Sequence, residues 1–148
     1  MKLIALLLLL VPLISLSQNS GNFKNYIAIG FLDHKTGTSF IGYSKSIIQN
    51  QNNELFVGFG TIIASNTLSI GFKKYLIKKK INCYSVVSLQ SVFGMGGAFN
   101  APAVSIGIEK GIIKNIFMNL GINSTIRFYS SKNTELITFP QVNLSIRY

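Results

Sequence analysis

The chain contains few acidic residues, few charges of either sign, and almost no cysteine or tryptophan. Of its 148 residues, four are Asp or Glu, one is Cys and none is Trp. A single cysteine excludes a disulfide scaffold and a zinc site built on cysteines. Only 12% of the residues are charged while 48% are hydrophobic, so neither a disordered polar chain nor a charge-rich helical bundle is expected. The length fits one domain.

The first residues have the pattern of an export signal. Lys2 is followed by an apolar run over residues 3–14, and then by the small residues Ser15 and Ser17 ahead of a polar stretch. This pattern predicts a signal peptide over residues 1–17 and a short lead over residues 18–23. A transmembrane anchor would need about 20 apolar residues and a charged flank, and the sequence has neither.

Beyond the lead, apolar residues alternate with other residues at period two, which is typical of β-strands. The alternating segments are residues 27–31, 39–48, 55–60, 68–73, 81–93, 104–109, 116–123 and 142–148. Between them, residues that favour turns lie at 33–37, 49–53, 64–66, 78–80, 94–102, 110–111 and 130–134. The sequence therefore predicts eight strands, and the longest connection is expected at residues 94–102.

The side of each strand opposite the apolar row decides the class of protein. A soluble barrel would expose many Lys, Glu, Thr and Asp side chains there. That side is instead mostly Gly, Ser, Asn and Ala, which suit the crowded interior of a narrow barrel. We therefore predict an all-β fold over residues 24–148, an eight-stranded antiparallel up-and-down transmembrane β-barrel with its apolar rows facing lipid.

Over residues 24–148 the chain resembles the small eight-stranded outer-membrane barrel proteins of Gram-negative bacteria. The most specific part is the last strand, which ends on Tyr148 with the apolar Ile146 two residues before it. This ending is similar to the signal that the family's barrel-assembly machinery recognises, although Asn143 stands where the family usually has glycine. Pro140 is expected at a bulge or near the rim, because it cannot donate to the sheet.

The resemblance implies an outer-membrane location after export, contact with the lipid bilayer and lipopolysaccharide, and a monomer. An even number of strands with a periplasmic N-terminus places the connections near 33–37, 64–66, 94–102 and 130–134 outside the cell. The remaining three connections then face the periplasm. We expect a structural or surface-interaction role, with no open pore, because side chains fill an eight-stranded lumen.

Three charged residues are predicted to meet inside the barrel. Lys73, Glu109 and Arg147 all point inward near the periplasmic ends of their strands, and Glu109 is expected to pair with at least one of the two cations. A structural cluster is the preferred interpretation, and a proton or ion gate is the alternative. Five other polar residues are expected in the lumen: Gln90, Asn119, Asn123, Arg127 and Asn143.

The sequence offers little for catalysis, since it has one histidine and four acids. His34 follows Asp33 in the first outer connection, as in barrel enzymes that modify lipid A, but their His-x-Ser pattern is absent. We interpret His34 as a solvated loop residue, and we predict no catalytic residue, metal or cofactor. Two alternatives remain open: an outer-membrane enzyme acting on lipid A or phospholipid, and a soluble exported barrel whose inward Val and Ile rows bind a small apolar ligand.

The surplus of lysine could also indicate that the protein binds a nucleic acid or an anionic lipid. The export signal and the lack of interleaved aromatic residues argue against nucleic acid, so residues 78–80 are interpreted as a turn marking the edge of the membrane-spanning band. Lys45 and Lys74 fall on the lipid-facing side and are expected near the interface or beside a bulge. Four aromatic residues are expected against lipid or at its interfaces: Tyr26, Tyr43, Phe59 and Phe72.

Overall fold

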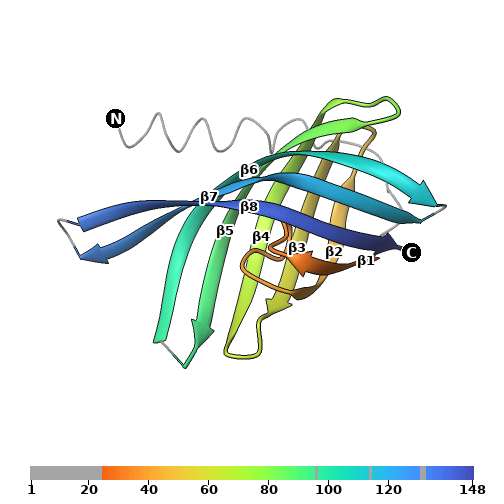
Figure 1. Ribbon diagram of the computed structural model, residues 1–148. Coiled ribbons are helices and arrows are strands. Elements are labelled where there is room, and N and C mark those ends of the chain that lie inside the picture. Colours follow the sequence, from red (N-terminus) through yellow and green to blue (C-terminus); the bar gives the residue numbers. More distant parts are fainter. Residues whose placement is uncertain (1–24, 96, 114, 131–132) are drawn as a thin grey trace.

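In the computed structural model, eight antiparallel strands close into a barrel in chain order (Figure 1). The structure describes residues 25–95, 97–113, 115–130 and 133–148, so the predicted signal peptide and lead lie outside the described residues. The strands are β1 (Asn25–Phe31), β2 (Ile41–Gln49), β3 (Asn53–Thr61), β4 (Ser65–Ile77), β5 (Asn82–Gly94), β6 (Gly97–Ile113), β7 (Ile116–Ser130) and β8 (Asn133–Arg147). The predicted eight-stranded up-and-down barrel is confirmed.

The apolar rows face outward, as the alternation predicts. Ile106 and Leu144 are 62% and 49% exposed, whereas their neighbours Ser105 and Ser145 are buried. Successive side chains of a strand point to opposite faces, so this difference fixes the orientation of β6 and β8. A soluble carrier of an apolar ligand would need the reverse orientation.

No helix that is long and apolar enough to span a membrane is present among the described residues.

One aromatic residue points the opposite way from its prediction. Tyr43 and Phe59 are more than two-fifths exposed on the outer face, and Phe72 is half-buried. Tyr26, however, is 1% exposed and lies inside the barrel. It is one residue from the outward Ile27, so the two-residue period of the strand turns it inward.

The predicted long connection at residues 94–102 is wrong. Strands β5 and β6 pair without interruption from Gly94 and Gly97 onward, and Pro102 pairs with Leu89. The predicted break at residues 110–111 is also wrong, because β6 continues to Ile113. Glycine and proline favour turns, but here they lie within a paired strand.

Both strand prolines stand where their strand has a neighbour on one side only. Strand β6 pairs with β7 only from Ala103 onward, one residue after Pro102. Strand β8 pairs with β1 only from Val142 onward, two residues after Pro140. A proline is tolerated in such a place because the side without a neighbour needs no donor. The expectation that Pro140 lies near an edge is therefore confirmed.

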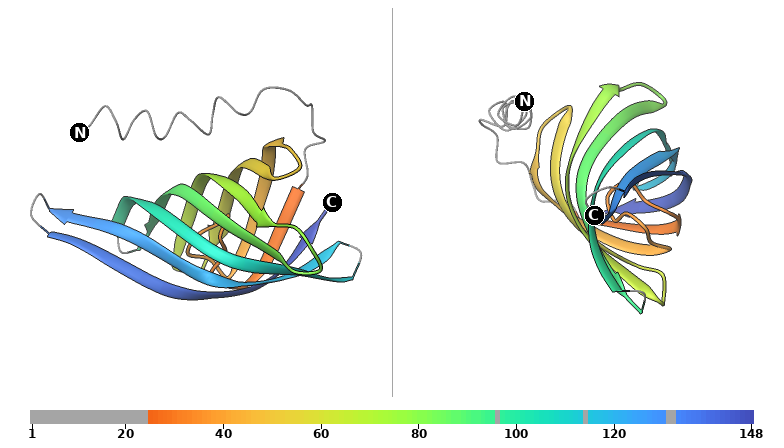
Figure 2. Two further views of the ribbon diagram at one scale, coloured as in Figure 1. Left: turned by 90° about the horizontal axis from the view of Figure 1, so that it is seen from above. Right: turned by 90° about the vertical axis from the view of Figure 1, so that its left-hand side faces the viewer.

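Strands β7 and β8 extend beyond the rest of the barrel. Past Thr125 and ahead of Val142 they pair with each other alone, and they project as a two-stranded arm (Figures 1 and 2). At the other end, backbone hydrogen bonds of 2.8 and 3.1 Å join Asn25 to Tyr148. We call this end of the barrel the terminal rim. It also includes residues 50–52, residues 78–81 and the connection of β6 to β7.

Lys45 and Lys74 are exposed near the terminal rim. They pair with Asn25 and Asn53, the first residues of β1 and β3. A register shift follows each lysine, between Ser46 and Ile48 and between Tyr75 and Ile77. The expected place near a rim and the expected bulge are therefore both present.

Candidate functional site

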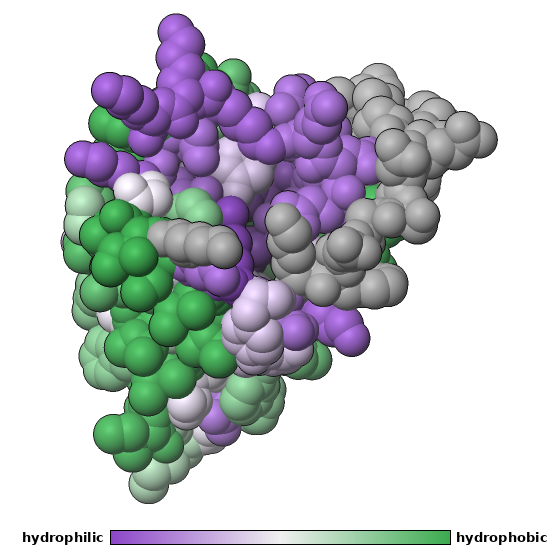
Figure 3. Space-filling model, turned by 90° about the vertical axis from the view of Figure 1, so that its right-hand side faces the viewer, coloured by the Kyte–Doolittle hydropathy of each residue, from purple (hydrophilic) through white to green (hydrophobic). Residues whose placement is uncertain are grey.

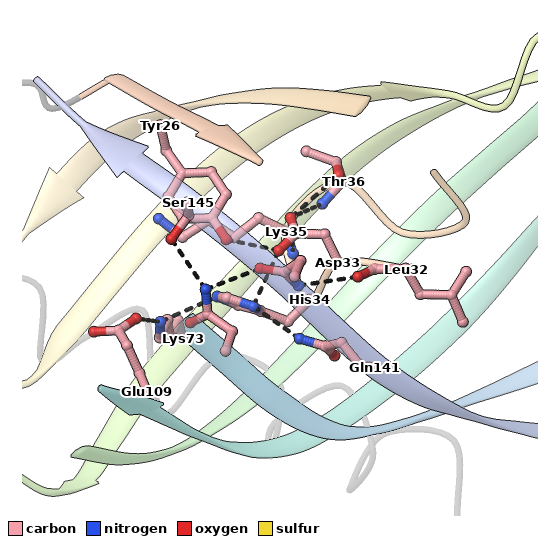
Figure 4. A network of polar contacts seen from close by, with 12 residues as sticks. Tyr26, Leu32, Asp33, His34, Lys35, Thr36, Lys73, Glu109, Gln141 and Ser145 are labelled. Atoms are coloured by element: carbon pink, nitrogen blue, oxygen red, sulfur yellow. Dashed lines mark hydrogen bonds and ion pairs between the residues drawn. The ribbon is translucent and has the colours of Figure 1, made fainter. Parts of the chain in front are cut away.

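The lumen of the barrel is filled by the connection between β1 and β2. Residues 32–40, which we call the plug, fold back into the barrel instead of extending from it (Figure 4). Leu32 has a φ of 58° and begins the inward turn, and Gly37 has a φ of 71° at its far side. The prediction that His34 is a solvated loop residue is wrong, since its side chain is completely buried.

Asp33 holds the plug in its folded shape. Its carboxylate accepts hydrogen bonds from the backbone N–H of Lys35 and Thr36, at 3.1 and 3.0 Å, and from the Thr36 hydroxyl at 3.1 Å. The Tyr26 hydroxyl donates a fourth bond, at 2.7 Å, from the wall. A buried carboxylate is costly unless its lone pairs are satisfied, and here the turn itself supplies most of the donors.

The wall of the barrel places Lys73, Glu109 and Arg147 together, as the sequence predicts. Lys73 Nζ lies 2.9 Å from Glu109 Oε2, and an Arg147 guanidinium nitrogen donates to the same oxygen. The Tyr75 hydroxyl donates to the other carboxylate oxygen at 3.2 Å. Glu109 is thus paired with both cations rather than one. The three strands that supply them, β4, β6 and β8, are linked across the lumen.

His34 lies at the centre of the plug and contacts this cluster. Its Nε2 is 3.0 Å from Lys73 Nζ, and its Nδ1 is 3.3 Å from Asp33 Oδ1 (Figure 4). Nε2 faces the donors of the Lys73 ammonium, while Nδ1 faces both the Asp33 carboxylate and the amide nitrogen of Gln141. Tyr84 stacks on the ring with centroids 4.5 Å apart, and Gln141 lies against Nδ1 at 3.1 Å.

The charge state of His34 follows from these surroundings. His34 lies in the connection between β1 and β2 rather than in a strand. Burial, followed by the repulsion of the Lys73 ammonium, lowers the pKa of His34 from its usual value of about 6.5 to about 4. The ring is therefore neutral at neutral pH, and it acts as a hydrogen-bonding element of the plug rather than as a charge.

A second ion pair connects the plug to the neighbouring strand of the wall, where Glu54 is in register with Lys73. Lys35 of the plug pairs with Glu54 of β3, and the Ser46 hydroxyl donates to the same carboxylate oxygen. The Lys35 ammonium also lies 4.4 Å from the centroid of the Tyr26 ring. Among the described residues, the buried charges of the lumen therefore balance: the cations are Lys35, Lys73 and Arg147, and the anions are Asp33, Glu54 and Glu109.

The five predicted lumenal polar residues lie in different places. Asn119 donates to Asn143 at 2.9 Å and to Ser145 at 3.0 Å, and Asn143 donates to the carbonyl of Leu32, which ties this network to the plug. The other three residues make separate contacts. Gln90 is buried and donates a hydrogen bond to Ser88, and Asn123 accepts one from Thr125. Arg127, which lies on the arm, stacks over Phe99 of β6.

Small residues of the wall provide the space for the plug. A Cβ at Gly42 would overlap Thr36, one at Gly58 would overlap the carbonyl of Lys35, and one at Gly60 would overlap Ser39. These glycines sit on the inner faces of two neighbouring strands, and Gly42 pairs directly with Gly60. Only a wall without side chains there allows the backbone of the plug to approach so closely.

The sequence contains a signal for the plug, although the plug is not predicted. Three inward glycines on adjacent strands leave a gap that a narrow barrel must fill, and the nearest polar connection is residues 33–37, which the sequence analysis places outside the barrel. The alternation of strands says nothing about such a connection. Asp33 and Glu54, which had no predicted role, become parts of the lumen for the same reason.

The terminal rim has a small opening between the plug and the wall. It is lined by Asn25, Tyr26, Lys35, Ser46, Gln49, Glu54 and Arg147. Figure 3 looks onto this end of the molecule, where hydrophilic surface lies over the upper part and hydrophobic surface over the lower left. Within the described part of the chain, no group of three or more His, Cys, Asp or Glu side chains is arranged to hold a metal ion.

The predicted assembly signal lies at the same rim. Ile146 and Tyr148 are 43% and 60% exposed, and both face outward at the end of the last strand. Tyr148 is also held by its backbone against Asn25. An outward aromatic residue is thus available at the chain terminus.

No protein-family model matches the chain, and no curated protein or solved structure is similar to it.

Proposed function

We propose that this chain is an integral protein of the bacterial outer membrane, with a structural or surface-interaction role and no open pore. The observation that carries the proposal is the contrast between the two faces of the closed sheet. Large aliphatic and aromatic side chains are exposed around the outside, while ion pairs, small polar residues and a few aromatic side chains such as Phe56 and Tyr84 fill the inside. Water would favour the opposite arrangement, whereas lipid favours this one.

The closed sheet supports the same proposal from the backbone. A bilayer offers no partners for N–H and C=O groups, so a spanning sheet must have no open edge at membrane depth. In the barrel every strand is paired on both sides over part of its length, including β1 with β8. The termini and short turns at the terminal rim fit the periplasmic side, and the arm at the other end fits the cell surface, where lipopolysaccharide lies.

The filled lumen supports a role without conduction or catalysis. The plug is buried and held by ion pairs at Glu54 and by contacts with Lys73. His34, the residue on which a lipid-modifying enzyme would depend, is enclosed in the lumen and away from the outer surface. Export by the predicted signal peptide and insertion by the barrel-assembly machinery through Ile146 and Tyr148 complete the proposal.

The test is to express the full chain in a Gram-negative bacterium and to separate soluble and membrane fractions. We expect the protein in the outer-membrane fraction, with an N-terminus after residue 17 by mass spectrometry. The detergent-folded protein should migrate faster on a gel before boiling than after it. Recovery in buffer without detergent, with no change of migration on boiling, would contradict the proposal.

A further inference from the structure

Among the described residues, six exposed lysines lie at or near the terminal rim, and we call them the lysine belt: Lys45, Lys74, Lys78, Lys79, Lys80 and Lys110. Lys45 lies on the outer face of β2 opposite Asn25, the first residue of β1, while Lys74 and Lys110 lie near the ends of β4 and β6. The other three occupy the connection from β4 to β5. Figure 3 shows hydrophilic residues gathered over the upper part of this end. The belt concentrates positive charge at one end of the barrel.

The acidic residues of the chain lie elsewhere. Asp33, Glu54 and Glu109 are buried in the lumen, where they satisfy the plug and the two wall cations. The fourth acid, Glu135, is on the arm, in register with Arg127 at the far end. Since the acids are used inside or at the other end, the outer surface of the terminal rim keeps a positive potential that an anion outside the protein can neutralise.

The belt lies among exposed aliphatic side chains. Leu76 and Ile77 precede the lysines of the turn and are 58% and 48% exposed, and Ile81 follows them. Ile112 and Ile113, which are 54% and 67% exposed, follow Lys110. A dissolved polyanion has no partner for such aliphatic groups. A lipid surface has partners for both, because the aliphatic groups enter the hydrocarbon while long lysine side chains reach the headgroups.

We propose that the lysine belt binds the phosphates of anionic phospholipids in the leaflet that surrounds the terminal rim. This inference rests on the proposed membrane location and adds the lipid class to it. Each lysine close to a lipid surface favours anionic over neutral lipid by about fivefold. The turn lysines Lys79 and Lys80 should contribute most independently of the barrel, because both are exposed and lie outside the strands, whereas the Lys78 ammonium lies 4.6 Å from the centroid of the Tyr75 ring.

The test measures which lipid the folded protein retains. The full mature protein is placed in vesicles of phosphatidylcholine with one-fifth phosphatidylglycerol, floated, extracted in a mild uncharged detergent and purified, and its bound lipid is quantified. We expect phosphatidylglycerol to be enriched several-fold over its share of the vesicle. The retained share of phosphatidylglycerol should fall towards its one-fifth share of the vesicle in the triple variant Lys78→Gln, Lys79→Gln, Lys80→Gln, and it should also fall in 0.5 M salt.

A matched pair of single variants separates position from net charge. Lys79→Gln should reduce the enrichment, whereas Arg127→Gln removes a cation from the arm and should leave it unchanged. Retention of the two lipids in their bulk ratio, or full enrichment in the triple variant, would overturn the belt as a lipid site while leaving the membrane location intact. A protein that floats with neither neutral nor mixed vesicles would overturn both proposals.

Discussion

Lys73 Nζ lies 3.0 Å from His34 Nε2, so a cation of the barrel wall holds the centre of the plug. The same ammonium is 2.9 Å from Glu109 Oε2. One lysine therefore ties the connection between the first two strands to the charged cluster of the lumen. Buried charges are stable only when they are paired and hydrogen-bonded, so the plug and the cluster stabilise each other.

Removal of the central carboxylate should destabilise the barrel strongly. In Glu109→Gln, Lys73 and Arg147 lose their common partner while they stay in the lumen. The free energy of unfolding should fall by about 3 kcal/mol, as for other buried pairs that lose one partner. The measurement is urea unfolding in lipid vesicles, followed by the migration of the folded band.

The control for this variant is Glu135→Gln, which changes an exposed acid on the arm. It should shift the free energy of unfolding by no more than about 0.5 kcal/mol, as surface substitutions usually do. Equal losses in both variants would show that the lumenal cluster has no special part in stability.

Removal of the plug should open the barrel. With residues 33–39 replaced by a short turn of glycine and serine, the space beside Gly42, Gly58 and Gly60 is no longer occupied. Ion conductance across a planar bilayer should be absent in the wild type and present in the variant. The control Glu135→Gln should stay closed. A closed variant that still folds would mean that wall side chains alone block the lumen.

A single methyl group on the wall should disturb the plug. A Cβ at Gly58 would lie 2.7 Å from Ser69 Oγ and would overlap the carbonyl of Lys35, which is backbone and cannot rotate away. Gly58→Ala should therefore lower the free energy of unfolding by about 1–3 kcal/mol. Increased conductance is also expected where the plug is displaced.

Gly111→Ala is the matched control, because its Cβ would meet only Phe117, at 3.6 Å. Both variants make the same change to the unfolded chain, so their difference reports the contact with the plug. We expect Gly111→Ala to unfold at a urea concentration no lower than that of the wild type, because alanine restricts the unfolded chain without a clash in the folded one. Equal stability of the two variants would contradict the close fit of the plug.

The neutral state of His34 predicts a pH dependence of stability. The unfolded chain takes up a proton on this ring near pH 6.5, whereas the folded protein does so only near pH 4. The free energy of unfolding should therefore fall as the pH falls from about 6.5 to 4, by about 3 kcal/mol, and this contribution should be lost below that window.

The difference between wild type and His34→Gln isolates this contribution, because glutamine does not titrate. Urea unfolding at a series of pH values between 4 and 7.5 should give a difference curve that flattens above pH 7. A difference that does not vary with pH would show that the ring is equally protonated in the folded and unfolded chain.

The eight strands and their orientation could be predicted from the sequence, because a two-residue period places Ile106 and Ser105 on opposite faces whatever the tertiary contacts. The meeting of Lys73, Glu109 and Arg147 could be predicted for the same reason, since strand parity and end position restrict where each side chain lies. The same parity turns Tyr26 inward, so the expected contact of Tyr26 with lipid did not agree with the alternation of its own strand.

The plug and the true connections could not be predicted in this way. Residues 33–39 have no periodicity, and their place depends on the space left by Gly42, Gly58 and Gly60 on other strands. The sequence predicts a break at Pro102 because proline lacks a backbone N–H donor, and this can be seen from the residue alone. Whether that donor is needed depends on where β7 begins to pair with β6, which is set by the register of the whole sheet.

The brevity of β1 has a consequence for how the barrel is made. β8 is held by β7 along the whole arm, but it meets β1 only from Arg147 opposite Tyr26 to Val142 opposite Phe31. This seam joins the first and the last strand of the barrel, so it cannot form before both have been synthesised. The ladders of β1 with β8 and with β2 are both short, so a lateral opening of the cylinder would begin beside β1.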